Sequence, residues 1–374
     1  MFNLKFSPMV GMLMILNVNK MLFAAFLVAA FVFGAFLSYL WVVGYYVSLE
    51  LKIPEKPVIS LYNFTVSAQD PTFFNITILN PSFSPRETDI LGIKVLTGDN
   101  IIHRVTSITP TIPVGGYRLH VGSSETFKCL WKWVNYTGQS INIIVLVEDG
   151  SGGTLTAKLP LVEVEITSLT LDPEHGDRFN LTIRNSQRST IGVDLESIKV
   201  IAGGISSSVK TYPSLPIRLE PSNSTGLLCE WNWTDHQGEI IKVIVNTSQG
   251  YISEWIQNVP NLFSIREIGF NPDDPTYLNI TVANSENSPI TLNITTITIT
   301  LKNGTILAPT NITPNLPYVI NINSTATFSC KWNWSAYSGE EVTITVSTEQ
   351  NYRAKSTYRI PQLTMEESAE RSYE

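Results

Sequence analysis

The chain has 374 residues, a formal net charge of −7 and only 15% charged residues. An average soluble domain has about 25% charged residues, and a polyanion-binding surface needs clustered Lys and Arg, which this sequence lacks. The composition therefore argues against nucleic acid as a partner, while the length allows two or three domains.

The first predicted element is an apolar helix near the N-terminus. Residues 21–49, between Lys20 and Glu50, carry no formal charge. A helix of about 20 apolar residues crosses a bilayer, whereas the apolar region of a cleaved signal peptide has about 7–15 residues. Aromatic residues that suit a membrane interface gather at its C-terminal end: Tyr39, Trp41, Tyr45 and Tyr46. We therefore predict a helix over 21–49 that anchors the chain in a lipid bilayer, after a short flank over 1–20, with Met21 as an alternative start.

A linker over 50–57 leads from this helix to a pattern that recurs three times. The stretch DPTFFNITILN at Asp70–Asn80 returns as DPTYLNITVAN at Asp274–Asn284 and as FNLTIRN at Phe179–Asn185. Each copy continues with a Pro-x-aliphatic-Pro element, a Cys-x-Trp-x-Trp row, a glycine nine residues after the cysteine, and a closing aliphatic–Pro pair. Every landmark returns after about 100 residues, which is the signature of tandem domains.

These landmarks delimit three repeats, named here repeat 1 (58–160), repeat 2 (161–260) and repeat 3 (261–361). An acidic tail over 362–374 is expected to be disordered. Only a few residues separate the closing proline of one repeat from the first strand of the next. Because proline fixes φ and lacks an N–H donor, the joints between repeats are expected to be stiff.

Alternating apolar residues predict strands throughout the repeats. Phe74, Ile76 and Ile78 alternate with mostly polar residues, and the same period of two returns in the other copies. No helical period follows residue 50, and short strands between Pro, Gly, Asn and Asp turns are typical of a β-sandwich. With about 100 residues and about seven strands, each repeat resembles the immunoglobulin or fibronectin type III class. The predicted fold class is all-β, with three tandem Ig-like β-sandwich domains preceded by one N-terminal transmembrane α-helix.

The Cys-x-Trp-x-Trp row is the predicted core of each repeat. Residues i, i+2 and i+4 of a strand face the same side, and the residues between them are mostly polar. Burying one Trp removes about 150–250 Å² from water, which contributes roughly 4–6 kcal/mol before the entropy of ordering is subtracted. The predicted core residues are Cys129, Trp131, Trp133, Cys229, Trp231, Trp233, Cys330, Trp332 and Trp334.

A single cysteine per repeat excludes a disulfide within a repeat. Equivalent positions in neighbouring repeats lie roughly 30–40 Å apart if the strands run along the array, whereas a disulfide needs Cα atoms within about 7 Å. We predict three free, buried thiols that act as small hydrophobic groups, and no cofactor. The Cys–Cys bridge that marks antibody domains is absent.

Thirteen Asn-x-Ser/Thr sequons are distributed along the repeats. A strand with Asn and Thr on its wet face creates a sequon automatically, but Asn is a poor strand former, so its repeated use favours N-glycosylation. The predicted acceptors are Asn63, Asn75, Asn135, Asn180, Asn223, Asn232, Asn246, Asn279, Asn293, Asn303, Asn311, Asn323 and Asn333.

The orientation of the helix follows from the sequons rather than from charge. Lys5 and Lys20 before the helix balance Lys52 and Lys56 after it, so the positive-inside rule is nearly tied. Glycosylated repeats lie outside the cell. The prediction is a single-pass protein of the cell membrane with its N-terminus inside and its repeats outside.

Thr- and Asn-rich sandwich repeats with dense sequons and one membrane helix resemble surface-layer or pseudoperiplasmic proteins of archaea. Our hypothesis is a membrane-anchored extracellular stalk, adhesin or envelope scaffold whose partners are other cell-surface proteins or glycans. One alternative is an accessory subunit that docks a membrane-bound enzyme or transporter. Another is a pilin-like filament subunit, although Lys20-Met21 departs from the basic–Gly or basic–Ala cut of a pilin.

Catalysis is not expected from this sequence. No catalytic or phosphate-binding motif follows the helix. The histidines occupy different places in their repeats: His103, His120, His175 and His236.

Calcium binding near the repeat junctions is left open by the sequence. Calcium takes six to eight oxygen ligands, and repeat 1 supplies only Asp70 at the turn in question. The candidate ligands in the later repeats are Asp172, Glu174, Asp177, Asp273 and Asp274.

Overall fold

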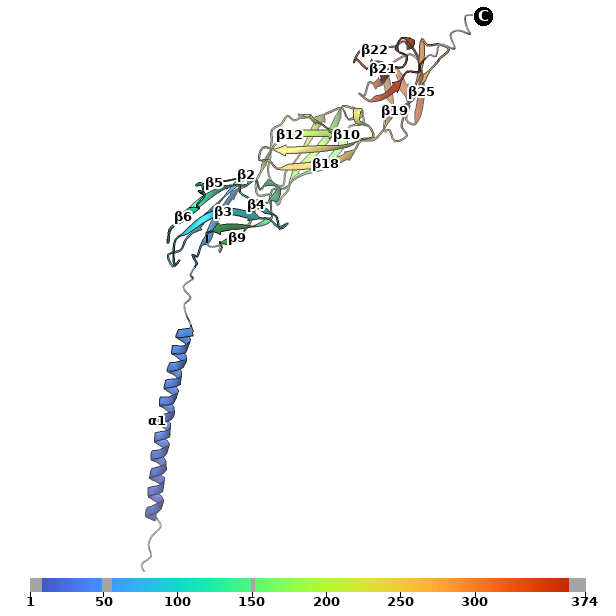
Figure 1. Cartoon of the computed structure of the whole chain (residues 1–374). Helices are drawn as coiled ribbons and strands as arrows, with labels where there is room; N and C mark the ends of the chain where they lie inside the picture. Colours follow the sequence, from blue (N-terminus) through green and yellow to red (C-terminus); the bar gives the residue numbers. More distant parts are fainter. Residues whose placement is uncertain (1–8, 49–55, 149–151, 363–374) are drawn as a thin grey trace, which may run out of the picture.

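The computed structural model describes residues 9–48, 56–148 and 152–362. In this part the chain is mostly β-structure, with six sheets and one N-terminal apolar helix. The repeats follow one another beyond the helix (Figure 1). The predicted tail lies almost wholly outside the described residues, as do most of the linker and the first part of the N-terminal flank.

Helix α1 (Met9–Ser48) has 40 residues and begins before the predicted start at residue 21. Residues 9–20, which the sequence assigns to a short flank before the helix, therefore extend it toward the N-terminus. The physical reason is that Lys20 is the sole charged residue of α1 and no proline interrupts it, so nothing stops the helix there.

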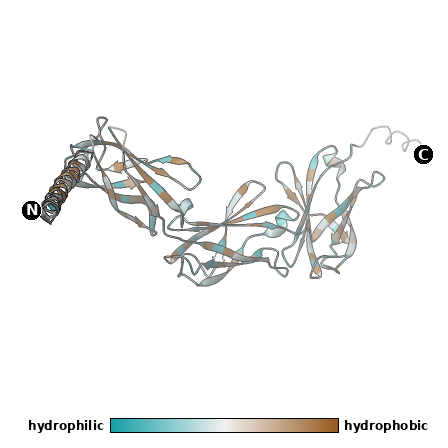
Figure 2. Ribbon diagram, turned by 90° about the horizontal axis from the view of Figure 1, so that it is seen from below, coloured by the Kyte–Doolittle hydropathy of each residue, from teal (hydrophilic) through white to brown (hydrophobic). Residues whose placement is uncertain are grey.

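The stretch Lys20–Gly44 of α1 is long and apolar enough to cross a membrane, and none of its apolar window is buried. At 1.5 Å per residue, its 25 residues span about 37 Å, more than the roughly 30 Å core of a bilayer. Figure 2 shows the helix coloured predominantly as hydrophobic, in contrast to the mixed colours of the strands.

Repeat 1 contributes two antiparallel sheets. The first has the order β1–β2–β7–β5: β1 (Ser60–Ser67), β2 (Asp70–Leu79), β7 (Ser124–Leu130) and β5 (Ser107–Thr109). The second has the order β4–β3–β8–β9, with β6 paired to β3: β4 (Ile102–Arg104), β3 (Thr88–Leu96), β8 (Ser140–Val147), β9 (Thr154–Lys158) and β6 (Tyr117–Leu119).

Repeats 2 and 3 build the same two sheets in the same order. Those of repeat 2 are β10 (Val164–Leu171), β11 (Arg178–Asn185), β16 (Ser224–Glu230) and β14 (Lys210–Tyr212), then β13 (Ile205–Ser208), β12 (Val193–Ala202), β17 (Ile240–Thr247), β18 (Ile252–Asn258) and β15 (Ile217–Leu219). Those of repeat 3 are β19 (Phe263–Phe270), β20 (Tyr277–Asn284), β25 (Ser324–Lys331) and β23 (Thr310–Thr313), then β22 (Ile306–Leu307), β21 (Leu292–Leu301), β26 (Glu341–Thr348), β27 (Arg353–Arg359) and β24 (Tyr318–Ile320).

Each repeat has nine described strands rather than about seven. The extra strands arise because the chain between the third and seventh strands leaves one sheet, joins the other and returns. The resulting order corresponds to strands A-B-E-D of an immunoglobulin sandwich in one sheet and C-F-G in the other.

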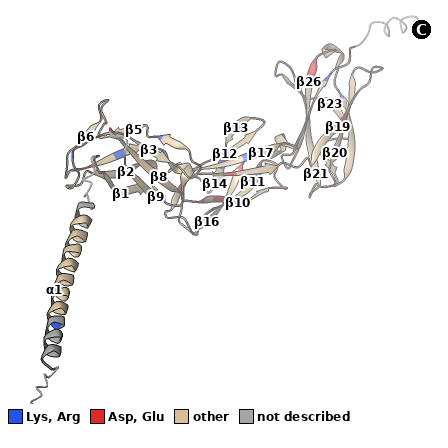
Figure 3. Cartoon of the chain, turned by 60° about the horizontal axis from the view of Figure 1, so that its bottom comes forward, with Lys and Arg blue, Asp and Glu red and all other residues tan. Residues whose placement is uncertain are grey.

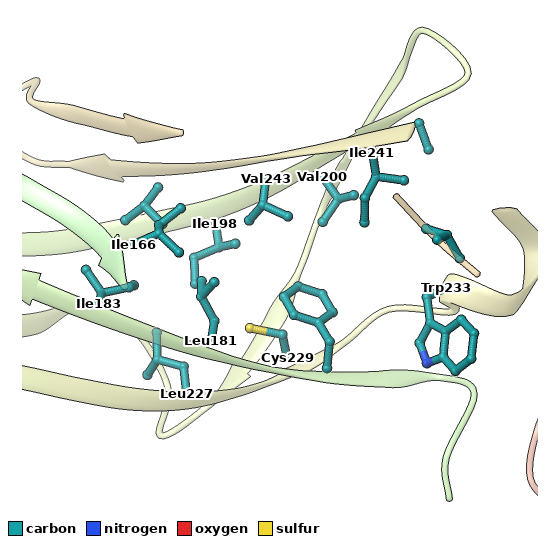
Figure 4. Close-up of a cluster of buried hydrophobic side chains, with 14 of the residues drawn as sticks. Ile166, Leu181, Ile183, Ile198, Val200, Leu227, Cys229, Trp233, Ile241 and Val243 are labelled. Atoms are coloured by element: carbon teal, nitrogen blue, oxygen red, sulfur yellow. The ribbon is translucent and has the colours of Figure 1, made fainter. Parts of the chain in front are cut away.

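The core of repeat 2 illustrates how the two sheets close on each other. Side chains of β11 and β16 face those of β12 and β17 across the interior (Figure 4). Among the labelled residues, those on the two inner faces and at the end of the core are Leu181, Ile183, Leu227, Cys229, Ile198, Val200, Ile241, Val243 and Trp233. Such burial of both inner faces is the main stabilising contribution in a domain of this size.

The Cys-x-Trp-x-Trp row corrects one sequence expectation. The strand ends at Leu130, one residue after the cysteine, and does not continue through both tryptophans. Trp131 and Trp133 still donate backbone hydrogen bonds to Thr72 and Pro71, each at 2.9 Å. The register of the ladder would pair Trp133 with Asp70, so the bond to Pro71 is one residue out of register; the ladder stops there and a 3₁₀ turn follows.

The other repeats end the row in the same way. The 3₁₀ turns are η1 (Val134–Tyr136), η2 (Trp233–His236) and η3 (Ser335–Tyr337). Repeat 3 again has a proline, Pro275, whose carbonyl accepts from the second tryptophan. Repeat 2 has Gly176 at this place, and that exception matters for the joint to repeat 3.

Candidate functional sites

The second tryptophan of each row is fully buried in its repeat. Trp133, Trp233 and Trp334 are at most 1% exposed. Each indole Nε1 donates to a backbone carbonyl, of Phe73 at 3.1 Å, His175 at 3.4 Å and Tyr277 at 2.9 Å. These indoles are therefore packed and hydrogen-bonded, as a structural tryptophan must be when it leaves water.

The first tryptophan of each row stacks on the ring that comes five residues later. Trp131 lies over Tyr136 and Trp332 over Tyr337, with centroids 5.4 Å apart in both repeats. In repeat 2, His236 takes the same place at 4.9 Å, and Trp231 is only half-buried. These pairs close the side of each core and leave no exposed aromatic platform at the row.

The three cysteines are 0% exposed and free. Burial raises the pKa of each thiol to about 12: Cys129, Cys229 and Cys330. A buried thiol with a raised pKa is a poor nucleophile and a poor metal ligand, because both roles use the thiolate.

None of the thirteen sequon asparagines is buried. Nine are exposed: Asn63, Asn135, Asn180, Asn223, Asn279, Asn303, Asn311, Asn323 and Asn333. Four are half-buried: Asn75, Asn232, Asn246 and Asn293. Most of the predicted acceptors therefore lie where a transferase can reach them.

The acidic turns that raised the question of calcium use their carboxylates locally. Asp172 accepts from the backbone N–H of Glu174 at 2.9 Å and lies 3.1 Å from His175 Nδ1. Asp274 accepts from the backbone and side chain of Thr276. No group of three or more His, Cys, Asp or Glu side chains suited to a metal occurs within the described residues. These turns are Asx turns of the ordinary kind.

The histidines do not converge. His103 contacts Thr97 and Tyr136, while His120 lies 2.8 Å from Glu87. His236 lies 3.0 Å from Glu239. Lys and Arg are likewise scattered along the strands in the view of Figure 3.

The joints between repeats are where the structure places its most specific polar contacts. At the joint of repeats 1 and 2, the hydroxyl of Tyr251 donates to the carbonyl of Ala68 at 2.9 Å. Gln249, two residues earlier, donates to the side chain of Gln69 at 3.2 Å. Tyr251 is only 4% exposed, so the contact is shielded from water.

The joint of repeats 2 and 3 uses the same tyrosine. The hydroxyl of Tyr352 donates to the carbonyl of Pro173 at 2.9 Å. Pro173 occupies in repeat 2 the place that Ala68 occupies in repeat 1, and Tyr352 occupies the place of Tyr251. Burial raises the pKa of both phenols, so both remain donors over the ordinary pH range.

The second joint adds contacts that the first lacks. Gly176, in place of proline, donates its N–H to the carbonyl of Gln350 at 2.7 Å. A Cβ at Gly176 would lie 2.8 Å from the carbonyl oxygen of Asn351, so only glycine allows this approach. Thr234 donates to that same oxygen at 2.9 Å, and the ring of Tyr352 meets Trp233 edge-on.

A charged cluster completes the second joint. Asp235 in η2 pairs with Arg353 at 3.3 Å and with Lys355 at 2.7 Å, both on β27. The equivalent positions at the first joint are Asn135, Ile252 and Glu254, which cannot form these pairs. The two joints thus share the tyrosine and differ in these surrounding contacts.

Comparisons with known proteins do not assign a family. No family model matches the chain. No curated protein matches it either.

Solved structures show distant likenesses. Activated Escherichia coli alpha-2-macroglobulin is 8% identical with a TM-score of 0.27, over 82% of this chain and 33% of that one. The class 5 fimbriae chaperone CfaA is 12% identical with a TM-score of 0.20, over 54% and 100%. The eight N-terminal Ig domains of Down Syndrome Cell Adhesion Molecule are 13% identical with a TM-score of 0.19, over 82% and 42%.

This chain spans only about a third of the length of that macroglobulin. Because each TM-score is below 0.5, these likenesses carry no argument about this chain. The fold of this chain is defined by its own sheets and joints.

The sequence analysis missed the joint residues. Tyr251 and Tyr352 both stand nine residues before the closing proline, at Pro260 and Pro361. Repeat 1, which has no repeat before it, has Ser151 at that place. A residue shared by the second and third copies and missing from the first was the available signal.

Proposed function

We propose that this chain is a membrane-anchored extracellular stalk, adhesin or envelope scaffold, built of three Ig-like sandwich domains carried on helix α1. The observation that carries the proposal is the repeated joint. Tyr251 and Tyr352 make the same hydroxyl-to-carbonyl contact with the preceding repeat. Repeats connected end to end by a shared contact suit a protein that spans distance and presents surfaces.

The exposed sequons support an extracellular position. Their accessible asparagines would carry N-linked glycans, with the N-terminus of α1 inside the cell and the repeats outside. Surface proteins of the archaeal kind described above combine these features. The partners of such a scaffold would be other cell-surface proteins or glycans.

A structural role is also favoured over catalysis. The buried thiols have raised pKa values, and the histidines lie in separate, locally satisfied settings. General acid–base or nucleophilic chemistry requires such groups to meet at one accessible place. We therefore infer no enzyme activity and no cofactor.

The proposal is tested on intact cells that express the full chain. We expect the protein to stay in the membrane after alkaline carbonate extraction, to shift in mass on glycosidase treatment, and to lose its repeats to external protease. Release by carbonate, or repeats protected until the cells are broken, would contradict it. Filaments of the purified chain in electron micrographs would favour the pilin-like alternative instead, and co-purification with an enzyme the accessory subunit.

A further inference from the structure

One end of each repeat faces whatever precedes it in the chain. In repeats 2 and 3 that end carries the tyrosine that docks on the previous repeat. The loop after the second strand of repeat 2 lies there too, because Arg188 and Thr190 line a hollow that Ala68 and Gln69 of repeat 1 also line. In repeat 1 the same end faces helix α1 (Figure 1).

This end is chemically different in repeat 1. Its docking tyrosine is replaced by Ser151, as noted above. Phe83 stands three residues after the buried Asn80, at the place of Arg188 in repeat 2 and Asn287 in repeat 3. The ring of Phe83 is 71% exposed. In repeats 2 and 3 this end contacts the preceding repeat through a tyrosine. Repeat 1 has no tyrosine at that place and has the exposed ring of Phe83 instead.

One further apolar side chain belongs to the same region, and the two together form the base patch (Phe83 and Val121). Val121 is 42% exposed in the turn before β7.

A buried asparagine fixes these segments to one another. The side chain of Asn80 donates to the carbonyls of Arg86 and Leu119, each at 3.1 Å. The main-chain carbonyl of Asn80 accepts a hydrogen bond of 2.7 Å from the backbone N–H of Gly122. The Phe83 loop and the Val121 turn are therefore held side by side at the end of the repeat.

The chain enters repeat 1 beside this patch. The N–H of Val58 donates to Ser84 Oγ at 3.1 Å, and Pro57 is buried. Val58 lies ten residue steps beyond Ser48, the last residue of α1. At about 3.3–3.6 Å per residue they reach at most about 35 Å, while the polar layer of a bilayer is roughly 5–8 Å deep on each side. The chain between Ser48 and Val58 therefore keeps the base patch within reach of the lipid surface.

We propose that the base patch rests in the interfacial layer of the bilayer, so that repeat 1 stands on the membrane instead of floating on its tether. The inference rests on the proposed function, in which α1 is the anchor. We take lipid as the occupant because this end of repeat 1 follows directly on the membrane helix. The same end of repeats 2 and 3 contacts the preceding repeat instead. An exposed aromatic ring with an aliphatic neighbour suits the boundary between headgroups and acyl chains.

The test uses the full chain in phosphatidylcholine–phosphatidylglycerol vesicles, with nitroxides placed by cysteine substitution. The native cysteines are buried and leave the added one to react. Phe83→Cys reports on the patch, Asn287→Cys is the matched control at the same place in repeat 3, and Phe33→Cys reports on the helix. Accessibility to oxygen and to a water-soluble nickel complex measures the depth of each label.

We expect the label at 33 to be deep in the hydrocarbon, the label at 83 to be interfacial, and the label at 287 to be in water. A label at 83 as accessible to nickel as that at 287, with 33 still deep, overturns this inference alone. A label at 33 in water overturns the anchor and this inference with it. A label at 83 shielded from nickel and from lipid-dissolved oxygen alike indicates a protein partner and also overturns it.

A second pair of variants keeps the native ring in place. The nitroxide is attached at Val121→Cys, with Phe83 intact or replaced by the residue of repeat 3, Phe83→Asn. We expect nickel accessibility at 121 to rise at least twofold in the Phe83→Asn chain. Equal accessibility in the two chains would show that Phe83 does not hold repeat 1 to the lipid.

Discussion

The hydroxyl of Tyr352 in repeat 3 donates a hydrogen bond of 2.9 Å to the carbonyl of Pro173 in repeat 2. Tyr251 repeats the contact with Ala68 at the same distance. The tyrosines stand on the turn between the last two strands of one repeat, and the carbonyls on the turn between the first two strands of the previous one. The same hydroxyl-to-carbonyl contact therefore links both pairs of neighbouring repeats.

Removing the tyrosine hydroxyl is expected to weaken a joint while the ring stays packed in it. In Tyr352→Phe the ring still packs on Trp233, but the carbonyl of Pro173 loses its donor. We expect the free energy of unfolding to fall by about 1 kcal/mol, measured by urea titration followed by tryptophan fluorescence. The control is Tyr62→Phe, because Tyr62 is 44% exposed. A Tyr352→Phe chain as stable as the control would show that the hydroxyl contributes nothing.

The two joints are expected to differ in stiffness, because only the second has the cluster of Asp235 with Arg353 and Lys355. Asp235→Asn removes the charge and keeps the size. It should broaden the angles between repeats 2 and 3, and high salt should have a similar but weaker effect on the unaltered chain. Glu239→Gln, which removes a carboxylate of the same repeat that faces only His236, is the control.

Electron–electron distance distributions measure this difference directly. Nitroxides at Arg104→Cys and Ser206→Cys span the first joint, and nitroxides at Ser206→Cys and Lys302→Cys span the second. All three positions are exposed. We expect a broad distribution across the first joint and a narrow one across the second, which widens in Asp235→Asn. Equal widths in the unaltered chain would contradict the unequal joints.

The β-structure and the apolar helix could be predicted from the sequence because each depends on local periodicity. The period of two at Phe74, Ile76 and Ile78 is a property of one strand, and all three side chains are 0% exposed. The end of β7 could not be predicted in this way. It depends on the partner strand, where Trp133 bonds out of register to Pro71, some sixty residues away along the chain.

The joints escaped prediction for a related reason. A tyrosine that donates to a carbonyl far away in sequence has no periodic signature of its own. Gly176 gave no sign either, because its role depends on Asn351 of the next repeat. The tyrosines and Gly176 stand out only when equivalent positions of the three repeats are compared, and not when residues adjacent in sequence are.

The buried asparagine that follows the second strand is expected to be essential to each repeat. Asn185 is 0% exposed and donates to the carbonyls of Ile191 and Leu219, each at 3.0 Å. Asn185→Ala leaves both acceptors without that donor and should cost about 2–4 kcal/mol of unfolding free energy. Asn180→Ala is the control, because Asn180 is exposed on the same strand, β11. Equal losses in the two variants would contradict a special role for Asn185.

The buried thiols make stability depend on pH in the alkaline range. The pKa of Cys229 is raised to about 12 in the folded chain, against about 8.5–9 when unfolded. Between these values the unfolded chain has lost a proton that the folded chain keeps, so stability falls as pH rises. The slope is up to about 1.4 kcal/mol per pH unit for each thiol.

Urea titrations between pH 8 and pH 10.5 measure this slope. Cys229→Ala lowers stability at every pH through the cavity that it leaves, but it should also make the alkaline fall shallower by up to about 1.4 kcal/mol per unit. A parallel displacement of the whole curve, with no change in slope, would show that burial does not hold the proton on this sulfur.

Two sequons at the same place in their repeats are expected to differ in glycan occupancy. Asn333 is exposed, whereas Asn232 is half-buried at the second joint. The hydroxyl of Thr234, which completes the sequon of Asn232, is bound to the carbonyl of Asn351, and Thr234 is 2% exposed. If the chain is glycosylated after its repeats have docked, glycopeptide mass spectrometry should find sugar on Asn333 and little on Asn232. Loosening the joint with Tyr352→Ala should raise the occupancy of Asn232 and leave Asn333 unchanged. Full occupancy of Asn232 in the unaltered chain would mean that repeats 2 and 3 do not pack as described.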